Sequence, residues 1–169
     1  GLNGAFHKLL NSKNIISLGA NLGYATKGFD TKSLTWNEQW NGEKFDPTKS
    51  SGEAFQNTER VNYVETGLGL NYRYQKSART NLDLGIGALH LIEPEVSFNG
   101  DKPTKLPRRY TFSGVGNFRL TESLDLQLHA LLQIQTKYNE TVFGGLGKIY
   151  LDQNRGRELQ LHLGLGYRT

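Results

Sequence analysis

The chain has 169 residues, enough for one folded domain, and a net charge of +4 that comes from basic residues scattered along the sequence. Such a small, dispersed excess of positive charge argues against a nucleic-acid partner. The absence of cysteine excludes disulfides and thiolate metal sites, and the chain contains no run of about 18 apolar residues that would form a transmembrane helix.

Eight segments alternate apolar with polar or glycine residues, which predicts strands because side chains of a strand point to opposite faces in turn. In the segment 123–136, for example, Leu126 and Leu128 flank Gln127. Twenty glycines against four prolines also favour strands and tight turns over helices. In chain order, the predicted strands are 3–10, 14–27, 60–75, 80–92, 108–120, 123–136, 139–152 and 157–168.

Most of these segments exceed the roughly 9 to 11 residues that a tilted strand needs to cross a bilayer. An apolar face toward lipid and a polar face toward the lumen is typical of a transmembrane β-barrel. We therefore predict an all-β fold, an antiparallel transmembrane β-barrel, with residues 1–169 as a single domain. Because the first and last predicted strands reach almost to Gly1 and Thr169, we expect them to belong to a larger barrel whose further strands cover their edges.

A soluble β-barrel or β-sandwich is the alternative, and in it the apolar residues would point inward to a core. The length of the strands argues against it, since strands of soluble sheets are usually about 5 to 6 residues long. The polar face is also rich in glycine, as at Gly67, Gly69 and Gly85, where a solvated face usually carries Lys, Glu or Thr.

The connections between strands predict an orientation. Segments 11–13, 76–79 and 121–122 are short and polar, and they alternate with long loops at 28–59 and 93–107. Outer-membrane barrels have short periplasmic turns and long extracellular loops. We therefore expect an outer membrane protein of a Gram-negative bacterium, with both long loops outside the cell.

No motif for catalysis, cofactor binding or metal binding is present, so we expect a protein that is not an enzyme. His7, His90, His129 and His162 show no ligand spacing, although His129 and His162 both have lumen-facing parity and are expected in one polar layer. The remaining inward positions carry charges that we expect to pair and brace the interior: Glu65, Asp83, Asp125, Glu158, Arg73, Arg119 and Arg168.

Three segments together resemble the PorP/SprF family: residues 45–53 (FDPTKSSGE), residues 87–98, and residues 105–110 (KLPRRY). In that family the residues after the histidine of the second segment usually read Leu-Asn-Arg-Pro, whereas this chain has Leu91-Ile92-Glu93-Pro94. The resemblance spans most of the chain but only the middle and later part of a family member.

The resemblance implies an outer-membrane protein of the type IX secretion system or of gliding motility in Bacteroidetes. It also implies partners: secreted cargo with a C-terminal sorting domain, periplasmic or outer-membrane secretion and motility components, and the lipid bilayer. No cofactor is implied. A passive diffusion or uptake channel is the alternative function.

The first long loop is longer than a simple connection needs, and such loops often carry function. Its aromatic residues, with charged residues beside them and at the end of the second loop, are the candidate partner-binding set: Trp36, Trp40, Phe45, Asp46, Glu53, Phe55, Arg108 and Arg109. In the alternative arrangement the aromatic residues pack the loop onto its own barrel as a lid, or continue the flanking strands beyond the membrane.

Overall fold

The computed structural model describes residues 1–30, 34–52, 60–98, 104–154 and 156–169. They contain eight strands, β1 (Leu2–Asn11), β2 (Asn14–Gly28), β3 (Arg60–Ser77), β4 (Thr80–Leu89), β5 (Arg109–Arg119), β6 (Leu124–Gln135), β7 (Tyr138–Asp152) and β8 (Leu159–Arg168). A short 3-10 helix, η2 (Asn37–Gln39), lies in the connection between β2 and β3.

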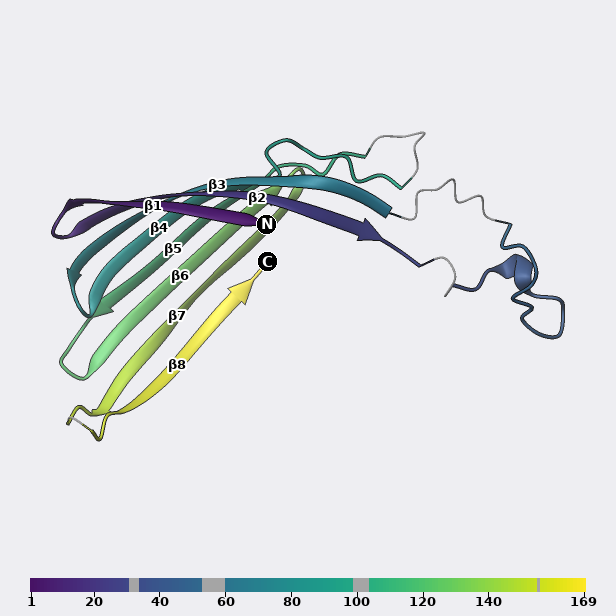
Figure 1. Cartoon of the computed structure of the whole chain (residues 1–169). Helices are drawn as coiled ribbons and strands as arrows, with labels where there is room; N and C mark the ends of the chain where they lie inside the picture. Colours follow the sequence, from purple (N-terminus) through teal and green to yellow (C-terminus); the bar gives the residue numbers. More distant parts are fainter. Residues whose placement is uncertain (31–33, 53–59, 99–103, 155) are drawn as a thin grey trace.

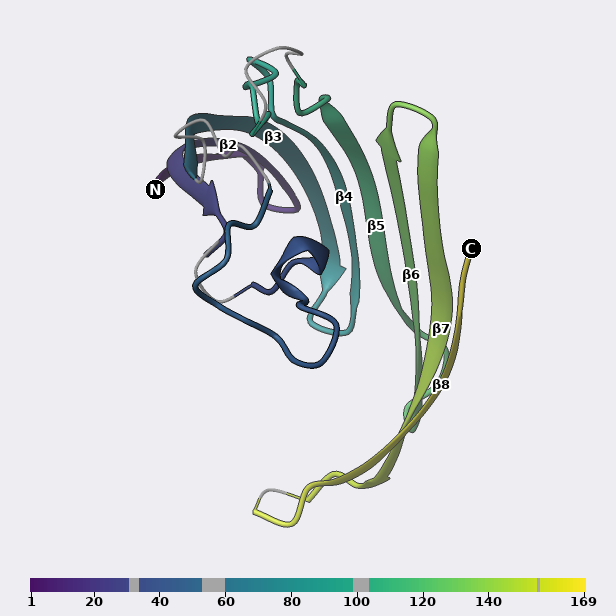
Figure 2. The ribbon, with the colours of Figure 1, turned by 90° about the vertical axis from the view of Figure 1, so that its right-hand side faces the viewer.

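Each strand pairs antiparallel with the next one in sequence, so the eight strands form a single sheet in the order β1 to β8 (Figure 1). The sheet is strongly curved, and its end strands β1 and β8 do not pair with each other (Figure 2). The prediction of an all-β antiparallel fold is confirmed. Within the described residues the sheet stays open and does not close into a barrel.

The predicted strand boundaries agree with the structure to within three residues. The largest difference is at β4, which ends at Leu89 rather than at residue 92. His90 and Glu93 have φ values of 56° and 46°, a left-handed conformation that the extended backbone of a strand does not allow. The chain therefore turns away from the sheet directly after Leu89.

The two faces of the sheet differ in chemistry and in exposure. Along β2, the apolar Leu18, Leu22 and Tyr24 are exposed, whereas the small and polar residues between them are half-buried. The apolar positions form rows across the strands, such as Leu18, Leu70 and Ile86. No hydrophobic side chain among the described residues is buried, so this sheet has no apolar core of the kind that a soluble barrel or sandwich requires.

The small and polar residues lie on the concave face, where side chains crowd one another and lose exposure. Asn81 and Asp125 are the buried polar residues of the described chain, 8% and 7% exposed, and both are on this face. The convex face is the apolar one, with Leu68 at 53% exposure. The assignment of apolar side chains to the outside and polar ones to the inside is thus what the structure shows.

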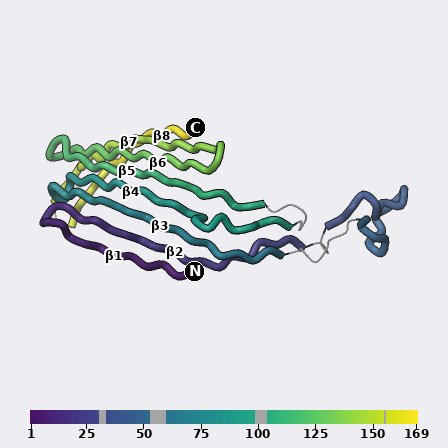
Figure 3. The backbone as a smooth tube through the Cα atoms, turned by 90° about the horizontal axis from the view of Figure 1, so that it is seen from above, coloured from purple at the N-terminus to yellow at the C-terminus, as the bar shows by residue number. Residues whose placement is uncertain are grey.

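The connections fall at two ends of the sheet, as Figure 3 shows from above. The connections 12–13, 78–79 and 120–123 and the described ends of the β7–β8 connection lie at one end, called the turn end below. The described parts of the β2–β3 and β4–β5 connections and the tight turn 136–137 lie at the other, called the loop end.

Candidate functional site

The described part of the first long loop, residues 34–52, forms a small folded unit. It is built around a hairpin in which Trp40 and Phe45 pair as an isolated antiparallel bridge. Asn41 and Gly42 make the turn: the Asn41 side-chain oxygen accepts the N–H groups of Glu43 and Lys44 at 2.9 and 2.8 Å, and Gly42 has a φ of 100°. Asn-Gly suits such a turn because glycine adopts positive φ without strain.

The unit continues on both sides of the hairpin. On the N-terminal side η2 begins after Trp36, whose N–H donates to the Gln39 side chain at 3.0 Å. On the C-terminal side the Asp46 N–H donates to the Gln39 carbonyl at 2.8 Å, which closes the unit. The hydroxyl of Thr48, 2.6 Å from the Asp46 carboxylate, and the Thr48 N–H, 3.0 Å away, hold the pKa of Asp46 below its usual value.

The aromatic side chains of this unit gather without being buried. The rings of Trp40 and Phe45 meet edge to face, with centroids 6.1 Å apart, and they remain 51% and 42% exposed. The unit lies beyond the ends of β2 and β3, away from the curved sheet (Figures 1 and 3). The structure therefore does not show the lid arrangement, and the Trp40 and Phe45 side chains remain about half exposed.

The second long segment is folded back against the end of the sheet. Arg108 donates to the Leu91 carbonyl at 3.0 Å and lies 3.8 Å from the Glu93 carboxylate. The charge of Glu93 thus faces an arginine. The Arg109 Nε is buried without a hydrogen-bond partner in the structure.

An aromatic contact joins the two long segments. Phe29, at the start of the first loop, meets Phe98 of the second with ring centroids 5.1 Å apart, and the Lys27 ammonium lies 5.4 Å from the Phe98 ring centre. The sequence analysis included Phe98 in the segment 87–98 but did not single out Phe29 or Lys27. No local motif predicts this contact, because only the fold brings the three residues together.

The candidate partner-binding residues thus separate into two places. Trp36, Trp40, Phe45 and Asp46 lie together in the folded unit, whereas Arg108 and Arg109 lie at the start of β5. Glu53 and Phe55 lie outside the described residues.

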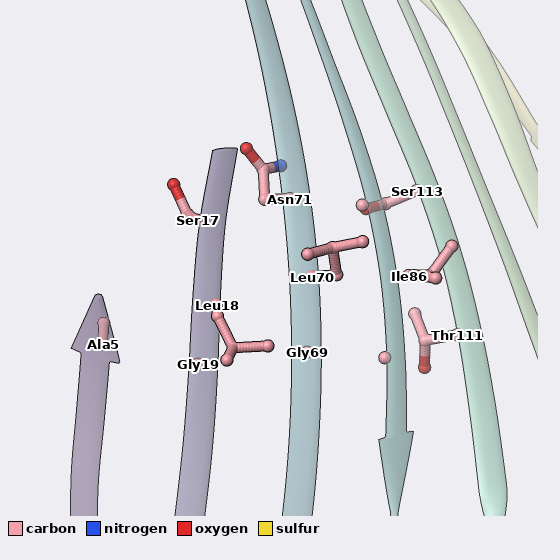
Figure 4. Close-up of a pocket in the computed structure, with 12 residues that line it drawn as sticks. Ala5, Ser17, Leu18, Gly19, Gly69, Leu70, Asn71, Ile86, Thr111 and Ser113 are labelled. Carbon is pink, nitrogen blue, oxygen red and sulfur yellow. The ribbon is translucent and has the colours of Figure 1, made fainter. Parts of the chain in front are cut away.

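The concave face contains a hollow of about 390 Å³ over β1 to β5 (Figure 4). Its floor consists of small residues, including Ala5, Gly19 and Gly69, and its polar edge includes Asn71 and Ser113. The same face also carries charges on strands from β3 to β8, and the expected pairing of inward charges is observed for five of the seven residues. The ion pairs are Arg73–Asp83, Arg79–Asp125, Arg119–Glu122 and Arg168–Glu140. The Glu65 carboxylate lies 3.3 Å from His90 Nδ1, a contact that is an ion pair only when the imidazole is protonated. Glu158 is in none of the ion pairs formed by the described residues.

The tightest of these pairs, Arg79–Asp125, joins two turn-end connections, 78–79 and 120–123, to the strands β6 and β7. Arg79, in the turn after β3, donates to both Asp125 oxygens, with distances of 2.6 to 3.0 Å, and to the Glu122 carbonyl at 2.7 Å. Its guanidinium carbon lies 4.3 Å from the ring centre of Tyr150, whose hydroxyl donates to Asp125 at 2.8 Å. We call Arg79, Asp125 and Tyr150 the arginine clasp. The inward parity of Asp125 was the available signal, but the identity of its partner was not predicted.

Neither a metal site nor a membrane-crossing helix is found. Among the described residues no group of three or more His, Asp or Glu side chains could hold a metal ion, and no helix there is long and apolar enough to cross a membrane. His129 and His162 are not in one row of paired residues, because His129 pairs with Gly144 whereas His162 pairs with Lys148, four residues farther along β7. Whether they share a polar layer of a tilted barrel stays a prediction.

Comparison with known proteins gives one match. No curated protein and no solved structure matches the chain at a level that supports an argument. The family described as type IX secretion system membrane protein PorP/SprF matches over residues 1–169. Its members are secretion-system membrane components that are not known as enzymes. The chain therefore belongs to the PorP/SprF family of type IX secretion system membrane proteins.

Proposed function

We propose that this chain forms part of the wall of an outer-membrane β-barrel and that its first long loop anchors secreted proteins at the cell surface. The proposal of a barrel wall rests on one observation: the convex face is apolar and exposed, and the described residues contain no buried hydrophobic side chain. In water such a face would be costly, at about 25 cal/mol per Å² of apolar area, whereas lipid is its natural solvent.

The open edges support a larger barrel. An unpaired edge in hydrocarbon leaves N–H and C=O groups unsatisfied, each at a cost of several kcal/mol. The exposed edges of β1 and β8 therefore require pairing with strands other than each other, contributed by the same protein or by another chain. A cysteine introduced at the edge of β8 tests this pairing by its reaction with a water-soluble maleimide in membranes. A cysteine on a covered edge should stay protected. Labelling as fast as in urea would contradict the closure of the barrel by further strands.

The connections support an orientation. Because outer-membrane barrels have short periplasmic turns and long extracellular loops, we assign the turn end to the periplasm and the loop end to the outside of the cell. In this orientation the folded unit of residues 34–52 would lie on the outer surface, where secreted cargo with a C-terminal sorting domain arrives.

The surface offered to that cargo is aromatic and half-exposed. Trp40 and Phe45 hold each other in place while leaving about half of each side chain free to contact a partner. Aromatic side chains held in this way are the residues that most often dominate binding energy at protein interfaces.

The test is a joint replacement of Trp36, Trp40 and Phe45 by alanine in the full-length protein. We expect normal barrel assembly, with surface cargo released into the medium. A matched control replaces Leu34 and Ile92, two exposed apolar residues of the same loops, and should leave cargo on the cells. Cargo retention by the aromatic variant would contradict the anchoring role.

A second candidate function, a diffusion or uptake channel, is favoured by the hollow of about 390 Å³ on the concave face. An unfilled lumen conducts ions in a planar bilayer, whereas a plugged one does not. Stable single-channel conductance of the full-length protein, altered when Gly69 is replaced by a large residue, would support the channel.

A further inference from the structure

We propose that a second, polar hollow, at the turn end of the concave face, binds a carboxylate presented by an acidic segment of a periplasmic protein partner. This hollow has a volume of about 310 Å³ and lies inside the arginine clasp. It is lined chiefly by Arg79, Asn81, Asn117, Asp125, Gln127 and Lys148. This hollow lies at the opposite end of the sheet from the unit of residues 34–52. The proposal rests on the proposed function only for the assignment of the turn end to the periplasm.

The walls of the hollow are held by the protein's own contacts. Asn81 and Asp125 are the most buried polar residues of the described chain. The Asn117 amide donates to the Asn81 side-chain oxygen at 2.9 Å, and Arg79 and Tyr150 fix Asp125 from two sides. A site whose walls are already ordered loses little conformational entropy when a ligand binds.

The charge that remains available in the hollow is positive. The Asp125 carboxylate accepts hydrogen bonds from Arg79 and Tyr150. Lys148 lies directly opposite Asp125 in the β6–β7 register and interacts with it electrostatically, but among the described residues it forms no hydrogen bond and no close ion pair, although it is half-buried. Two cations, Arg79 and Lys148, against one carboxylate leave a local charge of +1.

Hydrogen-bond donors surround this charge. The Gln127 side chain, which also lines the hollow, makes no hydrogen bond among the described residues, so its amide is free to donate. An ammonium and an amide side by side match a carboxylate, which is an acceptor only and forms its strongest hydrogen bonds with charged donors. In a half-buried position the attraction between the two charges exceeds that in bulk water.

The volume and the position of the hollow indicate the kind of ligand. A hollow of about 310 Å³ holds far more than one carboxyl group, since a water molecule takes about 30 Å³ in the liquid. It therefore suits an extended acidic segment, whose neighbouring residues fill the space beside the charged one. Because the hollow lies at the turn end, the segment would come from the periplasmic side.

The experiment measures binding of fluorescein-labelled tetraglutamate to the full-length protein in detergent by fluorescence anisotropy. We expect saturable binding that weakens about tenfold or more in K148Q, because the one cation of the hollow whose hydrogen bonds are not used within the protein is lost. The variant K137Q, in the turn at the loop end, removes the same charge at a distant place and should bind like the wild type. A labelled tetraglutamine peptide should not bind.

A second variant, Q127L, removes the amide but keeps the charge, and it should also weaken binding while the barrel stays resistant to urea. Equal affinity of K148Q and wild type, equal binding of tetraglutamine, or no binding of tetraglutamate to the wild type would each overturn the proposal. Cargo retention at the cell surface should be unchanged in K148Q, so failure of this inference and failure of the anchoring role are told apart.

Discussion

Replacing Leu128 with arginine tests which face of the sheet meets lipid. Leu128 is the fifth of the twelve residues of β6, it points to the convex face, and its side chain is 46% exposed. At about 3.3 Å per residue, it lies about 13 Å along the strand from Leu124 and about 23 Å from Gln135. With a strand tilt of about 40°, these lengths place it within about 5 Å of the middle of an apolar band about 25 Å tall.

An arginine near the bilayer midplane costs about 2 to 4 kcal/mol. Because about 1.4 kcal/mol corresponds to a factor of ten, the folding equilibrium should fall by about 30-fold to 900-fold. The matched control is Gln133→Arg in the same strand. Gln133 points to the concave face, directly opposite Glu140 of β7, so the new charge meets water and a carboxylate. We expect a loss below about 1 kcal/mol there.

The measurement is urea-dependent folding of the full-length protein into liposomes, followed by tryptophan fluorescence. Equal losses in the two variants, or a greater loss in Gln133→Arg, would refute the assignment of the convex face to lipid. A soluble fold would also reveal itself, since both variants would then fold without liposomes.

Three further outcomes follow from single contacts. Arg79→Lys keeps the charge but not the forked geometry, so we expect a lower urea midpoint in the same titration. Gly144→Ala should destabilise by about 1 to 3 kcal/mol, because its Cβ would lie 2.7 Å from a backbone oxygen of β8, whereas Gly4→Ala, with nothing within 4 Å, should be neutral. The pKa of Asp46 is lowered from 3.8, so the ionised carboxylate stabilises its turn above about pH 4, and this stabilisation is lost as the pH falls further. Faster amide exchange at Thr48 at low pH should report the loss. Thr48→Val should weaken this pH dependence.

The strands were predictable because their pattern is local. In β8, leucine at every second position from Leu159 to Leu165 sets both the secondary structure and the outward face, whatever the neighbouring strands contain. The one clear boundary error, at the end of β4, arose where His90 adopts a positive φ that an apolar pattern does not reveal.

The candidate sites were only partly predictable, because they depend on which strands lie side by side. Trp40 and Phe45 are close in sequence, and the Asn41-Gly42 pair between them is a hairpin signal that local reasoning had available. Arg79 and Asp125, in contrast, are 46 residues apart in sequence. Arg79 lies in the β3–β4 hairpin and Asp125 in β6, so β5 lies between them in the sheet. Inward parity identifies such a residue as a candidate for pairing, but register decides with which residue it pairs.

The two ends of the sheet are held in different ways, and this difference bears on what each can do. At the turn end, Arg79 joins its own hairpin to the β5–β6 connection and to the start of β6, and the Gln153 side chain adds a hydrogen bond of 3.0 Å to the Glu122 carbonyl. At the loop end, the unit of residues 34–52 is held mainly by hydrogen bonds within itself. Because a segment with few contacts to the rest of a protein can be displaced at low cost, the unit of residues 34–52 can adapt to different partners, as the proposed anchoring role would require. The turn end, where Arg79 and Lys148 line the polar hollow, suits a partner that meets a fixed shape.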